Sequence, residues 1–365
     1  MTKIPLMFNF LEKLDYKEVL KKNTNPLDLL DKLNIGKRTN DVVSPKVLIL
    51  TKRFDIESDL LGIQLLKNGI EYIKITEEDI PINLGAEFSI GSNNKFVLYL
   101  GKKKINCEEI RIVLFRYFDL KFLKRYSGIY QLYFEQQWYQ LFNCLQASLK
   151  RCLWINDAQR TFDAENRLNQ LQVAKSIGLN IPETSITNIP SSGKLFFKKH
   201  PKRTLVKVLH HHEIILKDIS HRLPTSMVSS NHVARFDELR YAPVILQEKI
   251  PNNKEIRITV IEDKVFPVSI TTTKDKNKYS DLHKIEERFL KFESLELEKS
   301  IRKKCVELNK QTGLLVSSMD FVEDKKGQMY FLEVNPIGDW NWLEKHVNTR
   351  ITDTLSKLIL RSLDD

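Results

Sequence analysis

Long apolar runs and cysteine pairs are both scarce in this sequence. The chain of 365 residues has no uninterrupted run of about 18 apolar residues, so no transmembrane helix is expected. Residues 1–10 lack a basic segment followed by an apolar core and a small-residue cleavage site, and we see no secretory signal there. The four cysteines show neither CxxC nor metal-ligand spacing, which favours reduced thiols in the cytoplasm.

The composition is that of a folded, basic protein. With 42% hydrophobic and 29% charged residues, the chain is long enough for a sizeable core and for two or three lobes. The net charge of +11 is spread along the chain without a recognition motif, so no nucleic-acid partner is expected. Attraction to polyphosphates or to an acidic polypeptide explains the charge as well.

The hydrophobic pattern predicts a mixed α/β protein. Residues 1–45 are polar and irregular, with one short helical candidate at Phe10–Lys22. From Lys46 a β-α-β unit begins, with a strand at Val47–Leu50 and a helix at Ile56–Lys67. Further helices are expected at Tyr130–Arg151, from Phe162 to Gly178, at Ser294–Thr312 and at Ile351–Leu363, and further strands at Ile70–Ile75, Phe96–Leu100, Lys102–Ile105, Ile110–Phe118, Leu205–Leu209, Ile214–Lys217, Val244–Glu248 and Glu255–Ile261.

Three metal-competent oxygen side chains, Asp320, Glu333 and Asn335, fall on one predicted hairpin near the C-terminus. Side chains alternate along a strand, so Glu333 and Asn335 point the same way. If residues 325–328 form a four-residue turn, Asp324 faces Met329 and Asp320 faces Glu333. Mg²⁺ prefers one or two carboxylates together with other oxygen ligands, so this hairpin predicts a magnesium site. The alternative is a solvated hairpin with scattered charges.

Other residues have the chemistry to meet a nucleotide. Lys207 lies inside a β-branched strand, where it either reaches a phosphate or extends from a sheet edge into solvent. Arg257 shares a strand face with Glu255 and either clamps a γ-phosphate or forms an exposed ion pair with Glu255. Arg167 either approaches phosphates or covers its helix with solvated charge. The extended segment Gln247, Glu248, Lys249 and Ile250 offers main-chain groups to an adenine edge, with Glu248 accepting from the adenine amino group.

One tryptophan pair and one histidine run are weaker indications of function. Trp340 and Trp342 either line a substrate groove or serve core or interface packing. The run His210, His211 and His212 has no carboxylate or cysteine pattern beside it, and successive strand residues alternate faces. We therefore favour a solvated or loop role for the three histidines over a metal site.

Taken together, the order and spacing of these residues resemble the ATP-grasp superfamily. Within it the chain is similar to the ribosomal-peptide maturases that make graspetides, namely the microviridin ligases and the grasp-with-spasm maturases. The resemblance covers roughly residues 110–365, and its most specific part is the pair of tryptophans that follows Asn-Pro-x-Gly. The residues that carry it are Trp154–Asn156, Glu165–Leu168, Gln170, Leu171, Ala174, Gly178, Leu179, Ile181–Thr184, Thr187, Asn188, Lys207, Gln247–Lys249, Glu255–Arg257, Met319–Phe321 and Phe331–Glu344.

The resemblance implies an ATP-grasp fold of three parts. These are an N-terminal pre-ATP-grasp α/β domain (1–155), a linker helix with a small central lobe (156–250) and a C-terminal mixed lobe with the magnesium site (251–365). It also implies that ATP and Mg²⁺ are the cofactors, that the partner is a precursor peptide with a leader and an Asp- or Glu-containing core, and that the protein is a cytoplasmic homodimer.

The implied reaction is macrocyclisation. A substrate Asp or Glu carboxylate attacks the γ-phosphate, Arg257 stabilises the transfer, and a Ser or Thr hydroxyl or a Lys amine displaces phosphate. Arg167, Lys207 and residues 247–250 contact ATP, with Glu255 as a candidate ribose contact. Arg116, Asp339, Trp340 and Trp342 are candidate contacts to the peptide.

Two positions depart from the family pattern, and two other functions stay open. Arg167 stands where Lys is frequent, and Asp339 stands where Gln is frequent, so a carboxylate there disfavours an acidic substrate or pairs with a substrate Lys. The nearest rival function is an ATP-grasp ligase acting on a free amino acid or a protein C-terminus. A non-catalytic basic protein that binds peptide or nucleic acid is the other.

Overall fold

The computed structural model describes residues 42–80, 83–92, 95–118, 128–209, 213–216, 219–272 and 285–364. The chain divides into two compact units, one formed by Met1–Leu153 with Arg361–Asp365 and the other by Trp154–Leu360. No helix in the described ranges combines the length and the apolar character that crossing a bilayer requires.

The first unit contains two four-stranded sheets, with strand orders β3-β2-β7-β8 and β1-β6-β5-β4. Strand β2 is buried along its whole length and pairs in parallel with β3 and β7, as expected for a continuous Val/Leu/Ile run. The elements of this unit are β1 (Val42–Val43), β2 (Val47–Thr51), α4 (Ile56–Lys67), β3 (Tyr72–Thr76), β4 (Leu84–Ser89), β5 (Lys95–Leu100), β6 (Lys103–Asn106), β7 (Ile112–Phe115), α5 (Gly128–Ser148) and the start of β8 (Leu153–Ile155), whose last two residues belong to the second unit.

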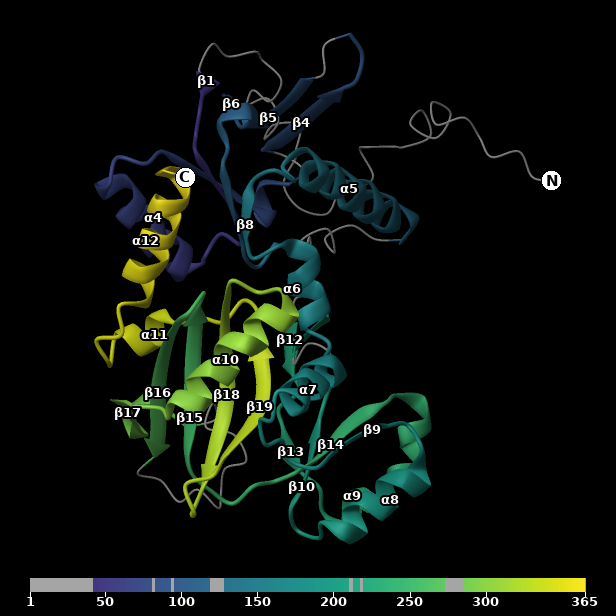
Figure 1. Cartoon of the computed structure of the whole chain (residues 1–365). Helices are drawn as coiled ribbons and strands as arrows, with labels where there is room; N and C mark the ends of the chain where they lie inside the picture. Colours follow the sequence, from purple (N-terminus) through teal and green to yellow (C-terminus); the bar gives the residue numbers. More distant parts are fainter. Residues whose placement is uncertain are drawn as a thin grey trace, which may run out of the picture. The chain divides into compact units, whose positions relative to one another are not determined.

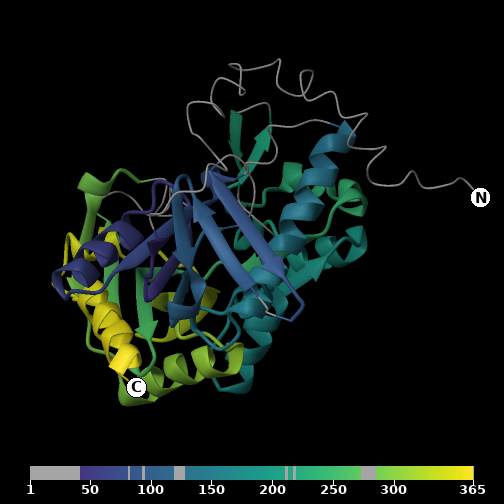
Figure 2. The ribbon, with the colours of Figure 1, turned by 90° about the horizontal axis from the view of Figure 1, so that it is seen from above.

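The long helix α5 supplies aromatic side chains to the core of the first unit. It lies alongside β4 and β5 (Figure 2), and its Trp138 and Phe142 line an apolar pocket together with Phe88 and Leu98 of those strands. The ring of Phe142 also stacks on Phe115 of β7 at 5.8 Å between centroids. Packing therefore explains two of the aromatic side chains of this helix, whereas Tyr139 is 50% exposed.

The second unit begins with two short helices and a small sheet of order β13-β10-β14-β9. Buried Phe196, Phe236 and Leu246 form the core of this small lobe, between helix α8, the 3-10 helix Phe236–Tyr241 and one face of the sheet. Its elements are α6 (Ala158–Ala164), α7 (Arg167–Ser176), β9 (Thr184–Thr187), α8 (Pro190–Lys199), β10 (Thr204–Lys207), β11 (Glu213–Leu216), β12 (Ile219–Arg222), β13 (Ser226–Met227), α9 (Ser230–Val233) and β14 (Val244–Glu248).

The rest of the second unit is built on a five-stranded antiparallel sheet of order β17-β16-β15-β18-β19. Helix α10 crosses one face of this sheet (Figure 1), and Cys305 and Leu308 of the helix pack in the core against Ile256 and Ile258. The elements are β15 (Asn252–Ile261), β16 (Lys264–Thr272), β17 (Leu290–Ser294), α10 (Lys299–Thr312), β18 (Val316–Asp324), β19 (Met329–Asn335), α11 (Asn341–Glu344) and α12 (Ile351–Asp364).

The mixed α/β class is confirmed, and most predicted elements are present within a few residues of their expected bounds. Two helix predictions were wrong in detail. The segment from Phe162 forms two helices, because Asn166 caps a new one by accepting a hydrogen bond from the Asn169 nitrogen at 3.1 Å. Ser294 ends strand β17, and the helix starts only at Lys299. The candidate helix Phe10–Lys22 lies outside the described residues.

Candidate functional site

The five-stranded sheet has one apolar face and one polar face. Ile256, Met319 and Val334 belong to the core under α10, and their neighbours in sequence point the other way. That opposite face carries Arg257 on β15, Asp320 on β18, and Glu333 with Asn335 on β19. Alternation along adjacent strands thus gathers the predicted metal ligands and one predicted phosphate ligand on one face.

The strand register places Asp320 between Arg257 and Glu333. Asp320 is the direct partner of Arg257 across β15 and β18, and of Glu333 across β18 and β19. The predicted pairing of Asp324 with Met329 was wrong, because Glu323 pairs with Met329 instead. A bulge between Asp320 and Phe321 in the ladder shifts the register by one and restores the predicted opposition of Asp320 and Glu333.

Hydrogen bonds join Arg257, Asp320 and Asn335, and an ion pair joins Glu333 to Arg167. Arg257 Nη1 donates to both Asp320 oxygens, at 2.8 Å each. Asn335 Nδ2 donates to Asp320 Oδ2 at 2.7 Å. Arg167, which starts helix α7, reaches Glu333 with Nη1 at 2.9 Å from Oε2. Both carboxylates are therefore paired with an arginine, and Asn335 completes the cluster.

The electrostatics of this face are dominated by Arg257. Burial favours the neutral form of its guanidinium, but Asp320, Glu333 and Asp339 together outweigh that effect and raise the pKa of Arg257 above its ordinary value. The side chain is only 11% exposed. Within the described part of the chain its Nε, which is also buried, has no hydrogen-bond partner. A fixed positive charge with an unused donor is suited to an incoming phosphate oxygen.

The donor set fits a hard divalent cation. Asp320, Glu333 and Asn335 offer carboxylate and amide oxygens from one sheet face, which is the ligand chemistry of Mg²⁺. Asn335 would present Oδ1 to a metal after rotation of its amide group, since Nδ2 now faces Asp320. A bound cation would compete with Arg257 and Arg167 for the two carboxylates.

In the small lobe, the side chains predicted to contact ATP lie on two different faces of the sheet. Lys207 pairs with Ile245, and Leu205 pairs with Gln247, so Lys207 and Gln247 share the face that is not packed on the lobe core. Gln247 donates from Nε2 to Thr184 Oγ1 at 3.1 Å, while its buried Oε1 has no partner among the described residues. This face can receive a ligand with both charged and polar groups.

Glu248 points the other way. The register pairs it with Thr204, and its Oε1 lies 2.9 Å from Arg203 Nη1. Its main-chain nitrogen donates to Glu183 O at 2.8 Å. The Glu248 side chain therefore does not face the side of the sheet where Lys207 and Gln247 lie, and its orientation does not favour the predicted interaction with an adenine amino group. Lys249 and Ile250 follow directly after β14, and Glu255 shares the face of Arg257 on β15.

The segment after β19 brings one candidate peptide contact to the site and buries another. Asp339 contributes to the pKa of Arg257, which places its charge near that guanidinium. Trp340 is 1% exposed, and its Nε1 donates to Thr352 Oγ1 at 2.9 Å, so core packing describes it. Trp342 is half-buried against Phe292, with 5.6 Å between ring centroids.

A close approach explains the glycine in this segment. A Cβ at Gly338 would lie 2.3 Å from both side-chain atoms of Ser318, Cβ and Oγ. Glycine therefore lets the chain that leads to Asp339 pass directly over β18, two residues before Asp320.

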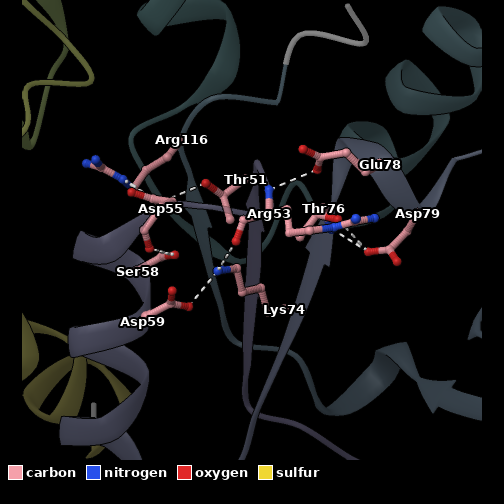
Figure 3. Close-up of polar contacts among 10 residues, drawn as sticks. All are labelled: Thr51, Arg53, Asp55, Ser58, Asp59, Lys74, Thr76, Glu78, Asp79 and Arg116. Atoms are coloured by element: carbon pink, nitrogen blue, oxygen red, sulfur yellow. Dashed lines mark hydrogen bonds and ion pairs between the residues drawn. The ribbon is translucent and has the colours of Figure 1, made fainter. Parts of the chain in front are cut away.

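Arg116 belongs to a buried cluster of the first unit (Figure 3). Its Nε lies 2.9 Å from Asp55 Oδ2, and Asp55 also accepts a hydrogen bond from Thr51 Oγ1 at 2.7 Å. The Arg116 side chain is 5% exposed. Burial favours protonation of Asp55, but the nearby Arg116 guanidinium and the hydrogen bonds outweigh it and hold the pKa of that carboxyl below its ordinary value of 3.8.

Two buried amides support the site, and sequence reasoning assigned them no role. Gln170 bonds the main chain of Val334, and Asn156 bonds the main chain of Val316 and Pro336. Both residues were noticed only as part of the family resemblance. No local pattern in the sequence shows that they reach a strand about 160 positions away. The histidine run His210–His212 lies outside the described residues.

Comparison with known proteins identifies a similar domain and a similar fold. Residues 202–359 match the sequence profile of the RimK-like ATP-grasp domain. A search of curated protein sequences gave no match. Among solved structures, the fold resembles macrocyclase MdnC bound with precursor peptide MdnA from Microcystis aeruginosa MRC, with 24% identity, a TM-score of 0.77, and coverage of 87% of this chain and 99% of that one.

Two further structures have the same fold. One is a RiPP-associated ATP-grasp ligase from Chryseobacterium gregarium in complex with ADP and a leader and core peptide, with 22% identity, a TM-score of 0.76, and coverage of 87% of this chain and 97% of that one. The other is the ATP-grasp ligase PsnB complexed with minimal precursor, Mg and ADP, with 17% identity, a TM-score of 0.69, and coverage of 87% and 97%. The ATP-grasp fold of the chain follows from these matches.

Proposed function

Because residues 202–359 form a RimK-like ATP-grasp domain, we propose that this protein is an ATP-dependent macrocyclase of a ribosomally made precursor peptide. The observation that carries the proposal is the cluster of Arg257, Asp320, Glu333 and Asn335 on one face of the C-terminal sheet. Its ligands suit magnesium, and its arginine suits a phosphate. The likeness to peptide-bound ligases supports a peptide as the second substrate.

In the proposed reaction, a peptide Asp or Glu carboxylate attacks the γ-phosphorus of ATP. The bond to the β,γ-bridging oxygen breaks, ADP leaves, and an acyl phosphate forms. A Ser or Thr hydroxyl or a Lys amine of the same peptide then attacks the acyl carbon, loses its proton and displaces phosphate. Each ring removes the elements of one water from the peptide.

The chain's own residues divide this work between the two lobes of the second unit. We assign Lys207, Gln247 and the main chain of residues 248–250 in the central lobe (156–250) to ATP, with Glu255 beside the ribose. Arg257, in the C-terminal lobe (251–365), supplies a fixed positive charge where charge develops on the transferred group, together with an Nε donor that has no partner among the described residues. Bound magnesium would neutralise phosphate oxygens while held by Asp320, Glu333 and Asn335.

The peptide contacts are assigned to residues near that charge. Asp339, whose carboxylate acts on Arg257, is placed to pair with a substrate Lys or to disfavour a second acidic group. Trp342 is half-buried on the same segment and is the better placed of the two tryptophans for contact with a peptide. A contact of Arg116 with the peptide, in the N-terminal domain (1–155), stays a prediction from the family resemblance, because its side chain is 5% exposed and paired with Asp55. A homodimer stays a prediction, which light scattering would measure.

Mass spectrometry tests the proposal directly. The protein is co-expressed with a short peptide encoded beside its gene that carries repeated Ser, Thr or Lys and Asp or Glu. We expect the peptide to lose one water per ring with release of ADP. An unmodified peptide, with ATP consumption stimulated by free amino acids, would support the rival amino-acid ligase instead.

Glu333→Gln provides the first variant. It removes one metal-binding carboxylate charge and is expected to reduce dehydration of the peptide at least about a hundredfold while the protein stays folded. Glu323→Gln is the matched control, because Glu323 lies on the same hairpin but pairs with Lys254 at 3.2 Å. Undiminished dehydration by Glu333→Gln would refute the metal assignment.

A further inference from the structure

Gln170 completes the hydrogen bonding of an edge strand. Strand β19 is the last strand of its sheet, so the outward main-chain groups of Val334 have no neighbouring strand. Gln170 is 1% exposed; its Nε2 donates to Val334 O at 2.9 Å and its Oε1 accepts from Val334 N at 3.1 Å. Its Nε2 also donates to Ala164 O at 2.6 Å. The side-chain amide therefore takes the place of a strand partner.

The position of this contact matters because of the bulge in the hairpin. Phe331 pairs with Phe321, and Glu333 pairs with Asp320, so Leu332 is the extra residue. Without the bulge, Asp320 would face Leu332 and Glu333 would turn to the opposite face of the sheet. Val334 is the residue directly after Glu333. A slip of one residue would turn its main-chain groups toward β18 and away from Gln170.

Asn156 fixes the same segment from its other end. It is 3% exposed, and its Oδ1 accepts from Leu315 N at 2.8 Å and Val316 N at 2.9 Å. Its Nδ2 donates to Val316 O at 2.7 Å and to Pro336 O at 3.0 Å. Asn156 thus joins the start of β18 to the residue that follows Asn335. Between them, the two amides hold the backbone on either side of Asn335.

We propose that Gln170 and Asn156 are positioning residues of the magnesium site. They hold the register of β18 and β19 in which Glu333 and Asn335 face Asp320. Neither amide contacts these three side chains in the hydrogen bonds described, but Gln170 Oε1 also accepts from Arg167 Nη1 at 3.4 Å, and Arg167 pairs with Glu333. The inference rests on the proposed function, because it assigns a metal to those three residues. Two buried amides with every donor and acceptor matched are strongly selective for one register.

Metal affinity distinguishes positioning from a general contribution to stability. Gln170→Met keeps the length and apolar part of the side chain but removes the amide. Asn309→Leu is the matched control, because Asn309 is also 1% exposed and accepts from Ser317 Oγ on β18 at 2.6 Å, with no hydrogen bond to β19 among the described residues. Both variants are expected to lower the melting temperature. Only Gln170→Met is expected to weaken Mn²⁺ binding.

The experiment measures Mn²⁺ binding to the full chain by electron paramagnetic resonance in the presence of ADP. We expect Gln170→Met to weaken Mn²⁺ binding about 10- to 100-fold, as outer-shell changes typically do, with little change for Asn309→Leu. If Gln170→Met does not fold, Gln170→Asn retracts the amide by one methylene and is expected to show the same loss. Asn156→Ala is expected to act in the same direction.

The possible failures are distinguishable. Wild-type protein that binds neither Mn²⁺ nor ADP would refute the proposed function. Wild-type protein that binds both, with Gln170 variants that bind Mn²⁺ equally tightly, would overturn the positioning role alone. Equal weakening by Asn309→Leu would also overturn it, because the effect would then follow from lost stability.

Discussion

Arg116 with Asp55 and Arg257 with Asp320 are the same chemical pair in two settings. In the first unit the Asp55 side chain is 0% exposed and Arg116 is 5% exposed. In the second unit Arg257 is 11% and Asp320 is 25% exposed. Thr51 donates a hydrogen bond to Asp55, and we call this fully buried pair closed. Asp320 lies beside Glu333 and Asn335 on a partly exposed sheet face, and we call its pair with Arg257 open.

This difference separates a pair that holds a fold from a pair that can exchange partners. Removing one member of a closed buried pair leaves a charge that water cannot reach, which is costly to stability. Each pair has one buried polar atom with no hydrogen-bond partner among the described residues, Asp55 Oδ1 and Arg257 Nε, so exposure is what separates them: solvent does not reach Asp55 but does reach Asp320 of the open pair. A cation and a phosphate can replace the internal contacts of that pair. The predictions below test this distinction.

The largest effect is expected from Arg257→Ala on catalysis. Loss of the guanidinium removes stabilisation of the transferred phosphoryl group, and kcat should fall about 10²- to 10³-fold with a smaller change in the KM for ATP. Steady-state release of ADP measures both constants. Arg257→Lys keeps a charge beside Asp320 and controls for folding. An equal loss in kcat and in ATP affinity would show that Arg257 only binds.

The second effect concerns stability. Asp55→Asn removes the closer of two carboxylates that pair with buried Arg116, since Glu57 Oε2 lies 3.7 Å from its Nη2. The free energy of unfolding should fall by about 3 kcal/mol. Urea denaturation measures the change. Asp59→Asn is the control on the same helix, because Asp59 pairs with Lys74 at 2.6 Å but is 55% exposed, and it should change stability by about 0–1 kcal/mol. Similar losses for both variants would contradict the closed character of the Asp55 pair.

The third prediction is how the stability difference between wild type and Asp55→Asn depends on pH. The folded protein lowers the pKa of Asp55 below 3.8, so the stabilisation from its charge is complete above 3.8 and is lost as the pH falls through the folded-state pKa. The stability advantage of wild type over Asp55→Asn should therefore be constant near neutral pH and shrink below 3.8. Denaturation of both proteins at successively lower pH measures it. An advantage that grows on acidification has the wrong sign for this mechanism.

The smallest effect is expected at an exposed pair. Arg235 and Glu238 lie 2.8 Å apart, three residues from each other, with exposed fractions of 73% and 56%. Water screens this pair, and Arg235→Ala should leave the melting temperature unchanged within error. A clear drop would show that exposure is a poor guide to the energetics of ion pairs in this chain.

Much of the site could be read from the sequence because its signals are local. Alternation along β15, β18 and β19 puts Arg257, Asp320 and Glu333 on faces that the apolar residues between them define. The strand containing Lys207 and the strand ending in Glu248 were predicted for the same reason. The β-α-β unit from Val47 to Thr76 was predicted from equally clear periodicity.

Other features depend on contacts that no local pattern encodes. The direction of Glu248 toward Arg203 depends on the pairing of β10 with β14. The burial of Trp340 depends on the hydroxyl of Thr352 and the helix that carries it. Helix α8 was not predicted, although Pro190 at its first position is a recognised start signal.

By itself, the sequence determined the mixed α/β class, the polar and apolar faces of the C-terminal strands, and the residue types that suit magnesium and phosphate. These follow from side-chain periodicity and from donor chemistry, which each strand carries alone. The tertiary structure decided the register. The bulge at Leu332 sets Glu333 opposite Asp320, and the amides of Gln170 and Asn156 bond the main chain around it, because a strand pairing is fixed by its neighbours in space.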